Sequence, residues 1–567
     1  MRWTLKPTPD FEKINTLADT LQVDKHIATL LIQRGVETYE DAKKFFRPSL
    51  QDLHDPYLMK DMDKAVERIE KALQHRENIL VYGDYDVDGT SAVALMSSFL
   101  LSVYTNVSTY IPDRYDEGYG VSYQGIDFAH YNTFSLIIAL DCGIKAVDKV
   151  AYAKEKGIDF IICDHHLPGE TIPDAVAVLD PKRNDCLYPY KELCGCGVGF
   201  KLIQALGERL GKTTEDLMPY LDLVATAIGA DIVPITGENR VLAYFGLQVI
   251  NSNPRAGFRA IIQTLKKKTL DVSDVVFIIA PRINAAGRMK HGSHAVELMT
   301  ETDIEQAQIY AEEIENYNLS RREADSEITQ EALQLIENQG EQDRFTTVVY
   351  RENWHKGVIG IVASRLTETY YRPTVVFTKS GEKLAASARS VRHFDLYQAL
   401  EACEEYIEQF GGHKYAAGLT ILPENYEPFK QKFEEIVAAT IEPEMLIPEI
   451  SADLEIKLTD VNSKFFRILK QFAPFGPGNM TPVFLTKNLI ESGYSRRVGE
   501  EDKHLRLVVK PNGGEFITGI GFNMGEKYEA IKDKKPFDIV YSLDENEWNG
   551  NKSIQLKIRD LKLSEEI

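Results

Sequence analysis

Apolar positions along the chain follow two spacings at first, and each spacing predicts a different kind of structure. Residues 1–75 carry leucine and alanine at helical intervals, as in LADTLQ and AVERIEKAL, and predict a small helical region. From about residue 76, short apolar runs such as ILVYGD, LIIALD and FIICD alternate with helix-like stretches. This alternation is typical of a parallel sheet with crossover helices, so residues 76–300 are expected to form an α/β domain.

The next two segments predict a connecting helix and a second sheet. Residues 301–339 contain neither glycine nor proline and many strong helix formers, so 301–340 is expected to be one continuous helix roughly 50 Å long. It would act as a strut between domains. Strand-like and helix-like pieces then alternate again, as in TTVVY, GVIGIVASRL and TVVFT. Residues 341–446 therefore predict a smaller α/β domain.

The last 120 or so residues have a third pattern, of alternating strands only. Pieces such as PVFLTKNL, LRLVVK, FDIVYSL and SIQLKIRDL are joined by turn-rich links such as PNGG. About five or six strands in this length suit a small OB-like β-barrel over 447–567. The predicted fold class is α/β, with a parallel-sheet domain, a long helix, a smaller α/β domain and a barrel.

Composition agrees with several domains and changes the expectation about partners. The chain has 567 residues, of which 44% are apolar, enough for about three or four domains. Its 86 acidic residues outnumber 65 basic ones, and the formal charge of −21 argues against coating a nucleic acid through bulk positive charge. Any contact with DNA must then be local, and some acidic residues are expected in a metal site.

The cysteines and the N-terminus indicate the compartment. Six cysteines show no CxxC pair, and Cys194 and Cys196 lie one residue apart without a second pair at zinc-finger spacing, so they are interpreted as small core residues. The start of the chain lacks the layout of a signal peptide, and no apolar run approaches the roughly 18 residues of a membrane span. A soluble, cytoplasmic protein without a membrane partner is expected.

Aspartates follow four successive strand candidates of the first domain. Asp84, Asp141, Asp164 and Asp180 each come directly after an apolar run. The carboxyl ends of parallel strands meet at one edge of a sheet, so these side chains can converge. Any one of them, taken singly, is more simply a loop residue or a helix cap; the joint pattern favours a site. Asp180 begins an Asp-Pro turn and is left out.

More ligand-type residues lie beside these strand ends. Asp86 and Asp88 follow Asp84 in GDYDVDG, where an extended backbone would point alternate side chains to one side. His165 and His166 follow the third strand, and Asp231 lies in GADIVP. Hard oxygen ligands suit Mg²⁺ or Mn²⁺, and the imidazoles tilt the choice towards Mn²⁺.

At DYDVDG, LDCG and DHH the sequence resembles the DHH phosphoesterase family, which is named for its Asp-His-His motif. GGHKYAAG, near residue 413, resembles the glycine-rich signature of the family's accessory domain, DHHA1. The order of domains, with QFAPFGPGN in the last one, resembles the bacterial single-strand-specific exonucleases of this family. The resemblance implies 5′→3′ hydrolysis of single-stranded DNA to 5′-mononucleotides, with roles in DNA repair and recombination.

The resemblance also assigns residues. It implies that two divalent ions are held by members of one set, namely Asp84, Asp86, Asp88, Asp141, His165 and Asp231, and that His166, with Asp164, serves catalysis either as general acid or as electrostatic stabiliser. It marks Arg114, Ser387 and Arg389 as contacts to the 5′ phosphate, and Arg282 and Arg288 as residues near the cleft, for which solvated surface charges are an even alternative. A guanidinium offers paired donors to phosphate oxygens.

Substrate contacts are also expected from the accessory domain and the barrel. Gly411, Gly412 and His413 lie in GGHKYAAG, where backbone N–H groups near the start of a helix could cradle a phosphate or base; a plain glycine turn is the alternative. Phe516, Phe522 and Tyr541 are candidates for stacking on bases, although most are expected in the core.

Two other functions stay open at this stage. One is a DHH enzyme of short oligonucleotides or cyclic dinucleotides, although such enzymes resemble shorter chains without the barrel. The other is a non-catalytic scaffold that binds single strands in replication, against which the intact acidic set argues. A helicase and a single-strand-binding protein are candidate partners of the exonuclease.

Overall fold

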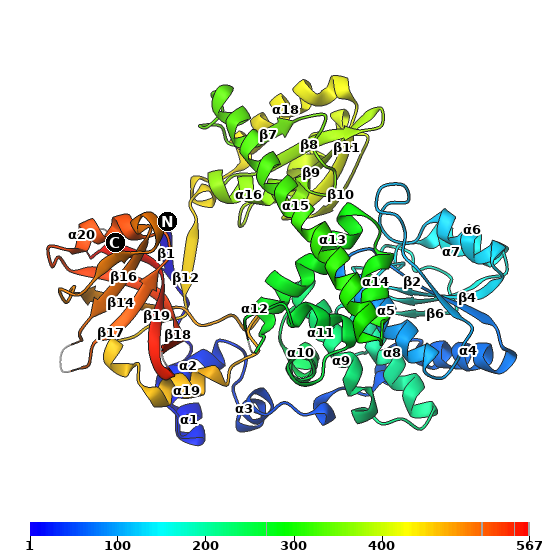
Figure 1. The fold of residues 1–567 in the computed structure, drawn as a ribbon, viewed down its shortest axis with the longest axis horizontal. Helices are drawn as coiled ribbons and strands as arrows, with labels where there is room; N and C mark the ends of the chain where they lie inside the picture. The colour runs from blue at the N-terminus through cyan, green and yellow to red at the C-terminus, as the bar shows by residue number, and fades with distance from the viewer. Residues whose placement is uncertain (268, 512–513, 549, 565–567) are drawn as a thin grey trace.

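The computed structural model describes residues 1–267, 269–511, 514–548 and 550–564. Figure 1 shows a sheet domain with many helices, a smaller sheet domain above it, and a third unit that carries both chain ends. Within the described ranges, none of the helices combines the length and the apolar character needed to cross a membrane. All six cysteines are buried and unpaired.

The first sheet has the parallel arrangement that the apolar runs predict. Its five strands pair in the order β3-β2-β4-β5-β6, and every pair is parallel. Apart from the partly exposed edge strand β3, the strands are buried on both faces, which explains why their runs are continuously apolar instead of alternating. Their bounds are β2 (Asn78–Gly83), β3 (Val107–Tyr110), β4 (Phe134–Leu140), β5 (Asp159–Cys163) and β6 (Ala177–Leu179).

Helices cover both faces of this sheet. One face packs on α6 (Tyr123–Tyr131) and α7 (Val147–Glu155), the other on α5 (Val87–Leu101) and α8 (Gly195–Arg209). Further helices extend the second core, and a short π-helix, Val275–Ile279, leads directly into α13. These helices are α9 (Leu221–Ala230), α10 (Gly237–Ser252), α11 (Ala256–Ile262), α12 (Val272–Asp274), α13 (Ala280–Met289) and α14 (Ser293–Thr300).

The predicted connecting helix is confirmed as α15 (Ile304–Asn338), which is 35 residues long and therefore about 52 Å. Asp303 caps its first turn by accepting a hydrogen bond from the backbone N–H of Gln306 at 2.9 Å. It packs against α13 of the first domain and α16 (Ile359–Tyr370) of the second. Figure 1 shows it running from one domain into the other.

The second domain has a mixed sheet in the order β10-β11-β9-β8-β7, in which only β7 and β8 are parallel. GGHKYAAG forms the hairpin β10–β11 and not the start of a helix, so the expected helix-terminus cradle is wrong. The elements are β7 (Thr347–Tyr350), β8 (Thr374–Ser380), β9 (Lys383–Arg389), α17 (Leu396–Glu401), β10 (Gln409–His413), β11 (Ala416–Ile421) and α18 (Tyr426–Thr440).

The C-terminal sheet has seven strands in the order β13-β14-β18-β19-β17-β16-β15. Of the aromatic candidates, Phe516 and Phe522 are exposed, whereas Tyr541 is fully buried and belongs to the core. The elements are β13 (Leu454–Glu455), α19 (Ser463–Lys470), β14 (Phe484–Leu489), β15 (Arg496–Val498), β16 (His504–Val509), β17 (Ile517–Gly521), α20 (Tyr528–Ile531), β18 (Phe537–Trp548) and β19 (Asn551–Leu563).

The N-terminal helical region divides between two cores. Helices α1 (Phe11–Leu21), α2 (Lys25–Ile32) and α3 (Tyr39–Phe46) share one core with the C-terminal sheet. In addition, β1 (Arg2–Leu5) pairs in parallel with β12 (Glu449–Ala452). Helix α4 (Met62–His75) instead packs on the first sheet. We call residues 1–46 together with 449–564 the barrel unit.

Candidate metal centre and neighbouring arginine cluster

The strand-end aspartates meet at the carboxyl edge of the first sheet, as predicted. Asp84 follows β2, Asp141 follows β4 and Asp164 follows β5, and all three are almost fully buried. Gly195, the first residue of α8, packs directly on this edge: a Cβ on Gly195 would lie 2.5 Å from the Cβ of Asp141. The helix can therefore approach the carboxylates only because that side chain is absent.

Asp86 and Asp88 reach the same edge by a different route from the one predicted. They do not lie on an extended segment: Asp86 is the N-cap of α5, and Asp88 lies in its first turn. The carboxylate of Asp88 accepts hydrogen bonds from the backbone N–H groups of Gly195 and Cys196, each at 2.7 Å. The N-terminus of α8 thus fixes Asp88, since helix N-termini stabilise nearby negative charge.

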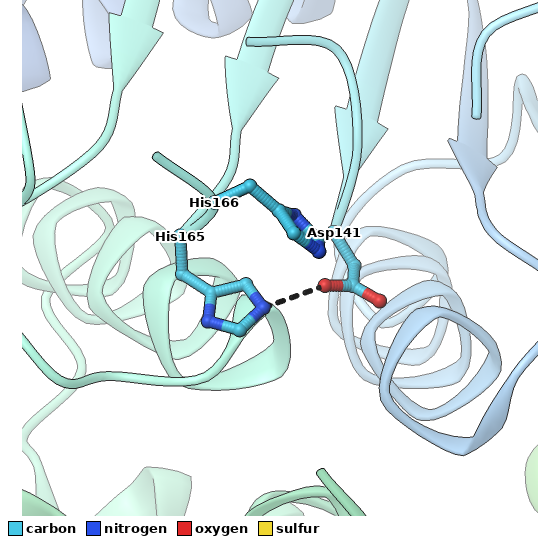
Figure 2. A group of neighbouring side chains, drawn as sticks. All are labelled: Asp141, His165 and His166. Atoms are coloured by element: carbon cyan, nitrogen blue, oxygen red, sulfur yellow. Dashed lines mark ion pairs between the residues drawn. The ribbon is translucent and has the colours of Figure 1, made fainter. Parts of the chain in front are cut away.

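His165 lies at the centre of the site. Its Nε2 is 3.2 Å from Oδ1 of Asp141, 3.6 Å from Oδ2 of Asp231 and 3.8 Å from Oδ2 of Asp88. Figure 2 shows the short approach to Asp141, with His166 beside it. Two sets of three residues each offer ligand atoms that all lie within 4.8 Å of one another. One set is Asp141, His165 and His166, and the other is Asp88, His165 and Asp231.

The protonation states favour cation binding. Burial, with repulsion by His166, lowers the pKa of His165 to about 3, which leaves a neutral imidazole with a free lone pair. Burial, with repulsion by neighbouring carboxylates, raises the pKa of Asp88 to about 6 and that of Asp231 to about 8, and it raises the pKa of Asp141 well above its ordinary value. Divalent cations would remove the repulsion that raises these pKa values.

Unpaired buried atoms test whether a metal fits here. Both ring nitrogens of His165, Oδ1 of Asp141 and Oδ2 of Asp84 are buried without a hydrogen-bond partner. Buried polar atoms are normally paired, so their concentration at one point requires an explanation. Carboxylate oxygens with a neutral imidazole form a donor set suited to Mn²⁺ or Mg²⁺. The residues therefore fit divalent ions. Asp86 is in neither group of ligand atoms but lies close enough to add to the repulsion on Asp88 and Asp141.

His166 and Asp164 form a separate hydrogen-bonded pair. Oδ1 of Asp164 lies 2.7 Å from Nδ1 of His166, and Oδ2 accepts from the backbone of Ile144 at 2.9 Å. Burial opposes both charges, but the pairing outweighs it, lowering the pKa of Asp164 to about 2 and raising that of His166 to about 8. The other ring nitrogen of His166 is 3.0 Å from the hydroxyl of Tyr119. Asp164 therefore orients His166.

Four arginines gather where α13, α15 and β9 meet. Arg288 is partly buried, and its pKa falls to about 10, first because of desolvation and then because of repulsion by Arg114, Arg321 and Arg389. Within the described ranges, none of the four forms an ion pair with a carboxylate. A group of partly buried cations that form no ion pair with a carboxylate is suited to binding an anion. We call these four residues the arginine cluster.

The cluster has further donors in the second domain. Arg389 Nη1 donates to Oγ of Ser387 at 3.0 Å. A Cβ on Gly360 would lie 3.0 Å from Oγ of Ser387 and 3.2 Å from Nη2 of Arg389, so the first turn of α16 approaches this pair closely. The unpaired N–H groups of a helix N-terminus attract anions, which adds to the pull of the arginines.

Two tyrosines connect the arginine cluster to the metal centre. The guanidinium of Arg114 lies 4.4 Å above the ring of Tyr85, the residue after Asp84. The ring of Tyr85 meets that of Tyr119 edge-on at 6.2 Å, and Tyr119 contacts His166. The cluster and the metal centre are therefore neighbouring parts of one site.

Two groups of predicted residues lie apart from this arrangement. Arg282 is paired with Glu315 of α15 at 2.6 Å, so its charge is already offset. Gly411 and His413 lie on β10, two strands from β9, in register with Ser387 and Arg389 through Gly418 and Ala416 of β11. Gly411 is exposed, and a Cβ on it would have no atom within 4 Å, whereas a Cβ on Gly412 would lie 2.5 Å from the Cα of Ala417.

Comparison with known proteins places the chain in a family. Its residues 78–228 match the DHH family N-terminal domain, 343–439 the DHHA1 domain and 452–560 the RecJ OB domain. The single-stranded-DNA-specific exonuclease RecJ of Bacillus subtilis is 37% identical over 569 residues, covering 100% of this chain and 71% of that protein. The chain belongs to the RecJ family.

Solved RecJ structures agree with this assignment. RecJ of Thermus thermophilus in complex with Mn²⁺ is 28% identical, with a TM-score of 0.85, covering 99% of this chain and 79% of that one. The same protein in complex with Mg²⁺ gives a TM-score of 0.78, with 26% identity over 99% and 78% of the two chains. The predicted fold class and the RecJ-family order of DHH, DHHA1 and OB domains are therefore confirmed.

Sequence reasoning missed Arg321, Gly360 and Tyr119, all of which lie at this RecJ-family site. Arg321 occurs in the acidic helix α15, four residues before Asp325, and such spacing ordinarily indicates a solvated ion pair. However, Asp325 pairs with Arg365 at 2.7 Å, and Nε of Arg321 is buried without a partner. The signal for Gly360 is its place at the start of a helix after a glycine-containing loop.

Proposed function

We propose that the chain is a metal-dependent exonuclease that hydrolyses single-stranded DNA from its 5′ end and releases 5′-mononucleotides, in DNA repair and recombination. The observation that carries the proposal is the proximity of two unlike sites. Buried carboxylates gather around His165, and beside them lies the arginine cluster, which forms no ion pair with a carboxylate of the described residues. The first suits cations and the second suits a phosphate. A strand that brings its phosphates to both satisfies both.

The metal centre is assigned to Asp84, Asp86, Asp88, Asp141, His165 and Asp231, which would hold two Mn²⁺ or Mg²⁺ ions. Two such ions supply an activated water, a clamp on the scissile phosphate and neutralisation of the charge that builds up during in-line displacement. The protein's part is to hold six side chains at one sheet edge against their mutual repulsion. The buried N-terminus of α8, through Asp88, does part of this work.

His166 and Asp164 are assigned to catalysis as a pair. Asp164 fixes the ring through Nδ1, so the opposite nitrogen faces outward towards Tyr119. Because the raised pKa keeps His166 protonated near neutrality, this nitrogen can donate a hydrogen bond to a phosphate oxygen or a proton to the leaving oxygen. Asp164 itself is a positioning residue.

Recognition of the 5′ end is assigned to Arg114, Arg288, Ser387 and Arg389, together with Arg321. A terminal phosphate carries more negative charge than an internal one, so a cluster of uncompensated guanidinium groups favours it. Gly411, Gly412 and His413, and the barrel unit with Phe516 and Phe522, are assigned to the rest of the strand. Arg282 is the weakest of the predicted contacts because Glu315 already offsets its charge.

Location and partners follow from the same proposal. Six unpaired cysteines support a cytoplasmic location, where thiols stay reduced. An enzyme that starts at a free single-stranded end needs a helicase to supply that end and shares its substrate with a single-strand-binding protein, so proteins of these two classes are the proposed partners.

Single strands labelled at either end, incubated with purified protein and Mn²⁺, test the proposal. Early release of a labelled mononucleotide from the 5′-labelled strand, without early release from the 3′-labelled strand or from a duplex, is expected. Cleavage of cyclic dinucleotides but not of long strands would instead identify a small-substrate phosphodiesterase. Binding of strands without cleavage at any metal concentration would identify a scaffold.

A further inference from the structure

The loop QFAPFGPGN, residues 471–479, takes no part in the metal centre or the arginine cluster. It follows α19 in the barrel unit and packs against residues 234–240 of the first domain. The backbone N–H of Ile235 donates to the carbonyl of Pro477 at 2.7 Å. A Cβ on Gly476 would lie 2.5 Å from Cγ1 of Ile235, and one on Gly478 would lie 2.9 Å from Cγ2 of Thr236. The glycines therefore permit direct contact between the two units.

Arg240, near the start of α10, enters this loop and is 5% exposed. Its Nε and Nη2 donate to the carbonyl of Phe45 at 3.1 and 2.8 Å, and Nη2 donates to that of Ala473 at 3.0 Å. Its Nη1 donates to the carbonyls of Phe472 at 2.9 Å and Pro474 at 3.3 Å. A guanidinium has five N–H donors, so every one of them is satisfied by the barrel unit.

Among the residues that the structure describes, no carboxylate takes part in this contact. Burial lowers the pKa of Arg240 to about 10, and its charge is met by backbone dipoles and by the ring of Phe45, whose centroid lies 3.9 Å from the guanidinium carbon. Phe45, Phe46 and Phe472 meet edge-on beneath it, with centroids 5.2 to 5.6 Å apart. We call the carbonyls and aromatic rings that surround the guanidinium of Arg240 the socket. The socket fits the planar shape and the donors of arginine, which a lysine reproduces only in part.

Hydrogen bonds within the barrel unit keep the socket in shape. Asn479 is 1% exposed, and its Nδ2 donates to two of the same carbonyls, those of Phe472 and Pro474, at 2.8 and 2.9 Å. Its Oδ1 accepts from Nε of Arg34 at 2.9 Å. Asn479 therefore orients these carbonyls through contacts that do not involve Arg240, so the socket is preformed in the barrel unit.

This socket has a special place in the connectivity. Residues 47–61 and 441–448 connect the barrel unit covalently to the rest of the protein, and Arg392 of the second domain pairs with its Glu449 at 3.3 Å. In the part of the chain that the structure describes, every hydrogen bond between the barrel unit and residues 62–338 comes from Ile235 or Arg240. Without the side chain of Arg240, one backbone hydrogen bond would remain between the barrel unit and residues 62–338, that of Ile235 to Pro477.

We propose that Arg240 is the positioning residue that locks the barrel unit onto the first domain, and that this lock determines the enzyme's preference for long single strands over short ones. The inference rests on the proposed function, in which the barrel unit binds part of the strand. Two linked binding modules reinforce each other only when they are held at a distance that the ligand spans, because their spacing sets the effective concentration at the second module. A fixed joint keeps that concentration high, and a loose one lowers it.

The test uses the full chain with Arg240→Met, which keeps an unbranched, flexible stem of shorter length but removes the donors and the charge. KM and kcat are measured with Mn²⁺ on 5′-phosphorylated strands of increasing length. We expect KM for the longest strands to rise roughly tenfold, with unchanged kcat and unchanged KM for the shortest strands. Small-angle scattering should show a larger radius of gyration for the variant than for the parent.

Arg372 offers a matched control inside one domain. It is 3% exposed, and its guanidinium donates to the carbonyls of Glu341, Gln342 and Arg344, all within the DHHA1 domain. Arg372→Met should lower thermal stability without a length-dependent change in KM. Arg240→Lys should give an intermediate rise in KM on long strands and scattering close to that of the parent.

An Arg240→Met protein with the parent's KM on long strands and the parent's radius of gyration would overturn the lock. If Arg240→Met does not fold, Arg240→Lys decides through KM alone: a KM on long strands equal to the parent's would overturn the lock. If the parent cleaves no strand of any length, the proposed function has failed; the scattering comparison then still tests whether Arg240 fixes the barrel unit.

Discussion

Replacing Arg389 by glutamine tests whether the arginine cluster recognises the 5′ phosphate. Nη1 of Arg389 is committed to Ser387 and to the carbonyl of Ala388, at 3.0 and 2.7 Å, and the structure records no protein acceptor for its other donors among the described residues. Those donors face a region where Arg288 is already repelled by three like charges. Glutamine keeps much of the volume but removes the charge.

The magnitude follows from the contact that is lost. One charge-assisted hydrogen bond to a phosphate contributes on the order of 2 kcal/mol, or roughly thirtyfold in kcat/KM. Strands with a 5′ phosphate should lose this factor, whereas 5′-hydroxyl strands should change little. Since Arg389 repels its neighbours and has no carboxylate partner, the ligand-free variant should melt at the parent's temperature or slightly above it.

The assay compares matched strands with and without the phosphate, alongside melting curves. Arg365→Gln is the control, because Arg365 lies on α16 but is paired with Asp325 at 2.7 Å, and its loss should leave the phosphate preference intact. If Arg389→Gln lowers the melting temperature and slows both strands equally, Arg389 is a structural residue. An unchanged ratio between the two strands would refute the terminal-phosphate assignment.

Three further outcomes are expected. Asp141→Asn should abolish cleavage and weaken stabilisation by Mn²⁺. It should also raise the melting temperature of the metal-free protein by on the order of 3 °C, for about 1 kcal/mol of relieved repulsion. A lower melting temperature without metal would contradict the repulsion. Asp164→Asn should reduce kcat on short and long strands alike while Mn²⁺ stabilisation persists, because Asp164 orients His166; loss of that stabilisation would make Asp164 a ligand. Deletion of residues 447–567 alone should yield an aggregating protein, since helices α1–α3 lose their core, whereas a fragment spanning 47–446 should stay soluble and cleave short strands; equal solubility of the two would refute the shared core.

The sheet edge could be predicted because its logic is local. Three apolar runs followed by aspartate define parallel strands, and parallel strands share a carboxyl edge, so Asp84, Asp141 and Asp164 had to converge. Helix α15 was equally accessible, since a long stretch without glycine or proline leaves little alternative. In both cases a short window of sequence contains the whole physical cause.

Asp86 and Asp88 show where local reasoning fails. Helix α5 is buried on all sides, so its sequence lacks the polar face that marks a surface helix, and it reads like a continuation of a strand segment. The residue that caps it, Asp86, is also a predicted metal ligand. The prediction for the segment of hairpin β10–β11 was wrong for the same reason. Its glycines are compatible with either a helix start or an exposed strand, and the pairing of β11 with β9 selects the strand.

Tertiary packing also decided which helices belong together. Helices α1 to α4 have similar amphipathic patterns, but α1 to α3 bury their apolar faces against strands more than 400 residues away. Strand β1 likewise pairs with the distant β12, with Arg2 opposite Glu449. No window of the sequence contains that partner. The apolar face of a helix predicts that the helix will be buried on that face, but it does not predict which element will cover it.

Three arginines show that the surroundings of a side chain, more than its type, determine its role. Arg282 forms an ion pair with Glu315, Arg240 faces backbone carbonyls of a second unit, and Arg288 faces other arginines and is therefore suited to an anion from outside. All three contribute equally to a formal charge of −21, which gave no hint of an anion site. A net charge averages over thousands of Å², whereas binding depends on charges that lack partners within one Debye length of the ligand. An acidic protein can therefore bind a polyanion, provided that its own carboxylates are elsewhere or occupied by cations.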